Sequence, residues 1–325
     1  MFSMSLGRLN KFATLAILPG MVLVIVLFSG AARQDSDEAV PPTAGTLVVA
    51  NLRSESLTFH NFANGRSSTL ALPGAPHEME ELNGRLYITL GRTDMLVEVD
   101  PAVPAVLRTL RIAGEPHGIA VHGDELVVSL DGRDALMAID LEKWTPSWVS
   151  PTGDTPHVVA SDGTALFVTD TRANTVRRLT AGSIATVQPA GDMPEALALA
   201  GAYVVAANYG SGTLSIFDAG TLGQVTTVEV GAGPVRVIAL DDTRVAVARQ
   251  GSPEVVVVAI PTGEVLDRFE APGRPDGLCL SPDEAHLAVA SNDENAAAVY
   301  TVDSWDRAVV VPMGDGPGAC TWLPR

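Results

Sequence analysis

Three histidines each follow a proline at a regular interval, and a glutamate takes the equivalent place after them. They are His77, His117 and His157, spaced 40 residues apart, and Glu195, which lies 38 residues further on. Neutral imidazoles together with a carboxylate form a ligand set that suits Zn²⁺ or another first-row divalent metal. Glu195 would then be a fourth ligand or a general base. Alternatively, Pro-His-Gly is a common form of a structural repeat, and these histidines bond to neighbouring backbone.

Charged residues flank the equivalent prolines later in the chain. Arg236 lies two residues after one proline, and Arg274 and Asp276 lie on either side of the next. We expect them at the same end of the fold as the histidines, where the arginines could bind a ligand carboxylate, or else pair with nearby acids. The chain has no Gly-rich phosphate loop, nucleophile elbow or His-Glu-x-x-His sequence, so no catalytic residue is assigned.

The chain contains two cysteines, Cys279 and Cys320. Cys279 lies four residues after its proline and Cys320 three, so their side chains have opposite parity on neighbouring predicted strands. Opposite parity would let both point into one shared interface and form a disulfide, and two buried free thiols are the alternative. No Cys-x-x-Cys-His sequence occurs, which excludes covalently attached c-type haem.

These spacings arise from an internal repeat. A proline closely preceded by glycine and followed by a short apolar run occurs seven times, with successive spacings of 40, 40, 38, 40, 41 and 42 residues. The seven positions are Pro76, Pro116, Pro156, Pro194, Pro234, Pro275 and Pro317. Between them, alternating strands such as Leu126–Leu130 and Ala135–Ile139 are joined by turns rich in Gly, Asn and Asp. Four short strands per unit with no intervening helix are typical of a propeller blade.

The two ends of the repeat region complement each other. It begins with predicted strands at Thr46–Ala50, Leu57–Asn61 and Ser68–Leu72, which match the second, third and outermost strands of a blade. It ends with Gly318–Leu323, which matches the innermost strand. We therefore predict an all-β fold over residues 46–325. It is a seven-bladed β-propeller of four-stranded blades, closed by pairing the N-terminal strands with the C-terminal innermost strand.

The repeats resemble the YVTN-type β-propeller repeats over about residues 46–325. The resemblance rests on Gly114–Val121 (GEPHGIAV), Leu280–Asp283 (LSPD) and Leu287–Asn292 (LAVASN). It implies the propeller fold but leaves the function open, because such propellers serve as binding scaffolds, surface proteins and occasionally enzymes. This chain departs from the pattern at Gln250–Pro253, where the usual Asp or Asn of the turn is missing.

The N-terminal segment has a different composition. Arg8 and Lys11 precede an apolar run over residues 12–28, which is followed by small residues at 29–32. This pattern predicts an export signal over residues 1–32, either a cleaved signal peptide or an uncleaved anchor that attaches the protein to a membrane through residues 12–32. Residues 33–45 are predicted to be a polar linker. Both alternatives place the propeller outside the cytoplasm, in a periplasm, on the cell surface or in the medium.

The composition narrows the classes of partner. The net charge of −17 and the lack of a basic stripe argue against nucleic-acid binding, whereas a divalent cation fits this charge. The absence of a compact catalytic motif favours a monomeric extracytoplasmic binding module for a protein, glycan or small ligand. The alternative is a metal-dependent hydrolase or lyase that uses the His/Glu set at the mouth of the central channel. A divalent metal is the one cofactor that the sequence suggests.

Overall fold

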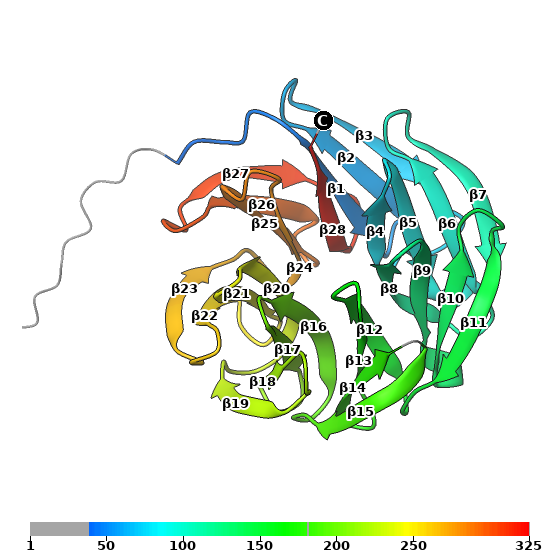
Figure 1. Ribbon diagram of the computed structural model, residues 1–325. Coiled ribbons are helices and arrows are strands. Elements are labelled where there is room, and N and C mark those ends of the chain that lie inside the picture. Colours follow the sequence, from blue (N-terminus) through cyan, green and yellow to red (C-terminus); the bar gives the residue numbers. More distant parts are fainter. Residues whose placement is uncertain (1–38, 181, 325) are drawn as a thin grey trace, which may run out of the picture. The chain divides into compact units, whose positions relative to one another are not determined.

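The computed structural model describes residues 39–180 and 182–324, which form seven β-sheets arranged in a ring (Figure 1). Each sheet has four antiparallel strands. The predicted all-β, seven-bladed propeller is therefore confirmed. Blades one to six take their strands consecutively, from β4–β7 to β24–β27, and blade seven combines β28 with β1–β3.

Within each blade the strands run from the axis outward. The innermost strands of blades one to seven are β4 (Met79–Leu82), β8 (Pro116–His122), β12 (Pro156–Ser161), β16 (Pro194–Ala200), β20 (Pro234–Asp241), β24 (Pro275–Leu280) and β28 (Pro317–Leu323). The second strands are β5 (Arg85–Leu90), β9 (Glu125–Leu130), β13 (Leu166–Asp170), β17 (Tyr203–Asn208), β21 (Arg244–Arg249), β25 (His286–Ser291) and β1 (Thr46–Asn51).

The outer half of each blade completes the sheet. The third strands are β6 (Met95–Asp100), β10 (Ala135–Asp140), β14 (Thr175–Thr180), β18 (Thr213–Asp218), β22 (Glu254–Ala259), β26 (Ala296–Thr301) and β2 (Ser56–Asn61). The outermost strands are β7 (Ala105–Arg111), β11 (Thr145–Pro151), β15 (Ser183–Pro189), β19 (Gln224–Glu229), β23 (Val265–Glu270), β27 (Arg307–Pro312) and β3 (Arg66–Ala71). Two short 3-10 turns, η1 (Gly91–Thr93) and η2 (Asp131–Arg133), follow β5 and β9.

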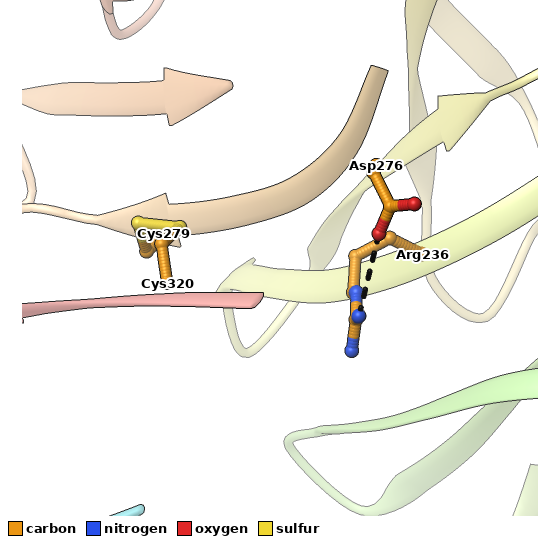
Figure 2. Close-up of a disulfide and its surroundings, with 4 residues drawn as sticks. All are labelled: Arg236, Asp276, Cys279 and Cys320. Atoms are coloured by element: carbon orange, nitrogen blue, oxygen red, sulfur yellow. Dashed lines mark ion pairs between the residues drawn. A yellow bond between two sulfur atoms is a disulfide. The ribbon is translucent and has the colours of Figure 1, made fainter. Parts of the chain in front are cut away.

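The ring closes as the two termini predicted. β28 pairs antiparallel with β1, with Cys320 opposite Val49. This pairing gives blade seven its innermost strand, so the ring has no open edge there. Cys279 on β24 and Cys320 on β28 form a disulfide with a Cα–Cα distance of 5.8 Å, which joins blade six to the closing blade (Figure 2). Of the two alternatives for the cysteines, the structure therefore has the disulfide.

The core consists of apolar layers between neighbouring blades. Seven clusters of buried side chains each combine residues of two adjacent blades. Phe167 of β13 and Phe217 of β18, both fully buried, meet in the layer between blades three and four. A sheet with apolar side chains on both faces cannot bury both alone, and for this reason the blades stack around a ring.

No helix in residues 39–180 or 182–324 is long and apolar enough to span a membrane. The predicted signal or anchor over residues 1–32, and the predicted linker up to residue 38, lie outside the described residues.

Candidate functional site: the channel mouth

The residues that follow the seven repeat prolines gather at one end of the ring. We call them the inner ring: His77, His117, His157, Glu195, Val235, Asp276 and Gly318. All seven line a single cavity of 370 Å³. In blades two to six a β-bulge follows the proline, for example between Pro116 and Ile119 and between Pro194 and Ala196. A bulge removes the next residue from the ladder and redirects its side chain, and so these side chains reach the cavity.

A second set of seven residues surrounds the first. We call it the outer ring, the residue directly after each second strand: Leu52, Gly91, Asp131, Thr171, Tyr209, Gln250 and Asn292. In six blades the outer-ring N–H donates to the carbonyl of the residue before the repeat proline, as from Tyr209 to Met193 at 2.8 Å and from Gln250 to Gly233 at 2.7 Å. This bond fixes the two rings relative to each other. Leu52, Tyr209, Gln250 and Asn292 also line the cavity.

The histidines pack against one another. The ring centroids of His117 and His157 are 3.9 Å apart, and those of His77 and His117 are 4.7 Å apart. His157 Nδ1 lies 2.8 Å from the backbone oxygen of Glu195, so this nitrogen is the donor and Nε2 is the ring atom left to bind a metal. Burial, followed by the neighbouring His157 and His77, lowers the pKa of His117 well below its usual value. His117 is therefore neutral, the form that binds metals.

Asp131, an outer-ring residue, completes a cluster with two of the histidines. One ligand atom each from His117, Asp131 and His157 lie within 4.8 Å of one another. His117 Nδ1 and Asp131 Oδ1 are buried atoms with no hydrogen-bond partner in the part of the chain that is described. Burial, with added repulsion from Glu115 and Glu195, raises the pKa of Asp131 to about 8. A positive charge between these groups would relieve both the burial cost and the repulsion.

The opposite side of the mouth holds paired charges. Arg236 Nη2 lies 2.8 Å from Glu78 Oε1 and 3.8 Å from Asp276 Oδ1, and Figure 2 shows the second of these pairs. Gln250 Nε2 donates to Asp276 Oδ2 at 2.9 Å, and the exposed Arg274 donates to Gln250 Oε1. Burial alone would lower the pKa of Arg236, but Glu78 and Asp276 outweigh it and raise that pKa. Burial also raises the pKa of Asp276, an effect that Arg236 opposes.

The Arg236–Glu78 pair separates this cavity from a second one. Both residues line the 370 Å³ cavity and also a second cavity of 400 Å³, whose wall includes Val121, Leu199 and Ile238. Glu78 belongs to blade one and Arg236 to blade five, so the pair bridges distant blades. It forms a charged boundary between the two cavities.

Every sequence-predicted site residue lines the mouth cavity, but not all belong to one cluster. His117 and His157 lie together, whereas His77 contacts the ring of His117 and stays outside the three-residue cluster. The Glu195 carboxylate is 3.8 Å from His157 Nε2. Arg236 and Asp276 pair with each other and with residues around them.

Asp131 was missed by the reasoning from sequence, which considered only the residue after each proline. A signal for it exists, because the residue after each second strand recurs at the same interval, and Asp131 is the only carboxylate among these seven.

No protein-family profile and no curated protein matches the sequence. The fold is similar to solved structures. A functionally unknown protein from Desulfotomaculum acetoxidans has 14% identity and a TM-score of 0.76, with 86% of this chain and 99% of that chain covered. Hydrazine synthase from Kuenenia stuttgartiensis has 16% identity and a TM-score of 0.67, with coverages of 77% and 90%. Apo AztD from Citrobacter koseri has 11% identity and a TM-score of 0.68, with coverages of 87% and 98%. At these identities the likeness shows the fold alone.

Proposed function

We propose that this protein is an extracytoplasmic binding module that holds a divalent first-row metal ion at the channel mouth. The observation that carries the proposal is the convergence of His117, Asp131 and His157, with buried ligand atoms of His117 and Asp131 that find no partner in the described part of the chain. Buried polar atoms are normally hydrogen-bonded, and an ion held by these side chains would supply the missing partner. Two imidazoles and a carboxylate suit Zn²⁺ and its first-row neighbours.

The extracytoplasmic location rests on two observations. The Cys279–Cys320 disulfide is typical of proteins in oxidising compartments. The basic residues and apolar run at the N-terminus have the pattern of an export signal. We also infer that the blades belong to the YVTN-type repeat, on the strength of the GEPHGIAV, LSPD and LAVASN segments.

The test is the metal content of residues 33–325, purified without chelator or affinity-tag metal. We expect near-stoichiometric metal, which the His117→Ala/His157→Ala variant and the Asp131→Asn variant lose. His60→Ala is the matched control, because His60 lies on β2 and bonds Ser67 Oγ at 2.9 Å outside the mouth. Absence of metal from the parent protein, with no thermal shift on adding Zn²⁺, Ni²⁺, Cu²⁺ or Mn²⁺, would falsify the metal function.

A metal-dependent hydrolase or lyase is the second candidate. Three protein ligands leave a coordination position open, as in catalytic zinc sites, and the mouth cavity gives a substrate room beside it. Such an ion polarises a carbonyl or activates water, and Glu195 would accept the proton. Glu195→Gln should keep the metal and abolish any hydrolytic or lyase activity found by screening the metal-loaded protein. Equal activity in that variant would remove Glu195 from the chemistry.

A further inference from the structure

The histidine blades carry a hydroxyl that the other blades lack. It stands one residue before the end of the second strand, at Thr89, Ser129 and Thr169, in the three blades whose inner-ring residue is histidine. The same position in the remaining four blades holds alanine, at Ala50, Ala207, Ala248 and Ala290. All three hydroxyl side chains are fully buried, so their polar atoms must bond within the protein.

These hydroxyls bond to the backbone of the inner ring. Ser129 Oγ accepts from the Gly118 N–H at 2.7 Å and donates to the His157 carbonyl of the next blade at 2.5 Å. Thr89 repeats both contacts one blade earlier, accepting from the Glu78 N–H at 3.1 Å and donating to the His117 carbonyl at 2.5 Å. Each hydroxyl thus ties the strand behind one histidine to the carbonyl of the following histidine.

In blade three the link to the next blade is made by a histidine side chain instead of a hydroxyl. Thr169 Oγ1 accepts from the Val158 N–H at 3.2 Å. The link to blade four is made by His157 Nδ1 and the Glu195 carbonyl, 2.8 Å apart. A continuous series of polar contacts therefore runs from blade one to blade four along the side of the mouth that holds the candidate metal ligands.

The β-bulge that follows the proline differs in length between blades. In blades two and three the register moves from Pro116 to Ile119 and from Pro156 to Val159, so two residues leave the ladder. Two also leave it in blade seven, between Pro317 and Cys320, whereas in blades four to six one residue leaves it, as between Pro194 and Ala196. In blade four Ala196 pairs directly with Ala207, whereas in blade two the hydroxyl of Ser129 takes the place of that backbone partner for Gly118.

The two blades approach each other closely at this contact. A Cβ on Gly118 would lie 2.3 Å from the His157 carbonyl oxygen, so glycine is required where Ser129 bridges the two strands. Ser129 therefore bonds to both backbones at the point where the strands that carry His117 and His157 are in contact.

We propose that Ser129 is a positioning residue: by bonding both the Gly118 N–H and the His157 carbonyl, it keeps His117 and His157 in ligating geometry, and Thr89 makes the corresponding bonds one blade earlier. This inference rests on the proposed metal function for its affinity readout. Loss of a group that orients metal ligands commonly lowers metal affinity 10–100-fold.

The experiment compares Ser129→Ala with Ser129→Thr and Ser291→Ala in the full propeller. We expect Ser129→Ala to weaken Zn²⁺ binding by at least about tenfold, within the range for orienting groups. Ser129→Thr should rescue it, because threonine serves at this position in the neighbouring blades. Ser291→Ala is the matched control, since Ser291 is also fully buried and donates to a backbone carbonyl, that of Pro272, in blade six. Its affinity should equal that of the parent.

A metal-free readout separates this inference from the function on which it rests. We expect the ring-nitrogen NMR resonances of His117 and His157 to shift in Ser129→Ala and to stay unchanged in the other two variants. If the parent binds no metal but these resonances shift, the metal function fails and the positioning role stands. If Ser129→Ala leaves the histidine resonances and the Zn²⁺ affinity unchanged, or if Ser291→Ala changes them equally, the positioning role is wrong.

Discussion

The two sides of the channel mouth are made from the same repeat but differ in how their polar groups are matched. On the histidine side, His117 Nδ1 and Asp131 Oδ1 are buried and find no partner among residues 39–180 and 182–324. On the arginine side, Arg236 lies between Glu78 and Asp276, and Asp276 accepts a further bond from Gln250. One side therefore presents a histidine and a carboxylate atom that a ligand could satisfy. On the other side the charges are paired within the protein, and Arg236 Nε is the buried atom that lacks a partner among the described residues.

Equivalent positions in a symmetric fold can therefore differ in function. His117 and Asp276 both follow a repeat proline and both enter the same cavity. They differ in the residue behind them: Ser129 bonds the Gly118 N–H and the His157 carbonyl, whereas Ala290 at the equivalent position has no hydroxyl. The arginine side therefore holds paired charges, and the histidine side holds the candidate binding site.

The largest expected effect is on the arginine side. Arg236→Met should lower the free energy of unfolding by about 3–5 kcal/mol, because it leaves Glu78 and Asp276 buried without their cation. His117→Ala should lower the free energy of unfolding by only about 1 kcal/mol, a usual value for a single substitution. Urea unfolding of both variants measures the difference. Adding Glu78→Gln to Arg236→Met should recover part of the loss, and equal losses in the two single variants would remove the contrast between the sides.

The disulfide beside the arginine side should have the next largest effect. Cys279→Ser/Cys320→Ser should lower the free energy of unfolding by about 2–4 kcal/mol, because the bridge joins residues 41 apart and restricts the unfolded chain. Thermal unfolding with and without a reductant measures it. The reductant should destabilise the parent and leave the double variant unaffected; no response in the parent would contradict this.

Metal bound on the histidine side should stabilise the folded protein. Zn²⁺ at a free concentration one hundred times its Kd should raise the free energy of unfolding by about 2.7 kcal/mol, if it binds only the folded state. Asp131→Asn should abolish this gain, whereas Gln250→Ala, at the equivalent outer-ring position on the other side, should keep it. Equal loss in both variants would show that the ion does not distinguish the two sides.

A further effect depends on pH. Burial, with the neighbouring Glu78, raises the pKa of Glu80 to about 7. The folded state then keeps the Glu80 proton up to about pH 7, whereas the unfolded chain releases it near its ordinary pKa of about 4.3. The resulting stability is fully present below about pH 4 and is lost as the pH rises through about 7. Glu80→Gln should flatten the dependence of unfolding free energy on pH in this window, and Glu142→Gln, an exposed control, should not. A parent curve that rises from pH 4 to 7 relative to Glu80→Gln would contradict the direction.

Much of the site could be predicted because each inner-ring residue is marked by its own proline. The positions of His117, Glu195 and Asp276 follow from counting residues after that proline, and all three enter one cavity. Asp131 could not be assigned in the same way, because its importance depends on which residues of another strand approach it. The hydroxyl of Ser129 also has no evident role until the register of β8 against β9 is known.

The sequence by itself determined the number of blades, their strand order and the closure of the ring. These depend on features that can be read directly along the chain. They are the regular spacing of the prolines, the alternation of apolar and polar residues within each strand, and the residues of the turns. Only the tertiary structure decided which atoms meet. The cluster of Asp131 with His117 and His157, the Glu78–Arg236 bridge across the ring and the Cys279–Cys320 bond all join residues of different strands that the closed ring brings together. Those distances are set by the packing of all seven blades together, which no single segment encodes.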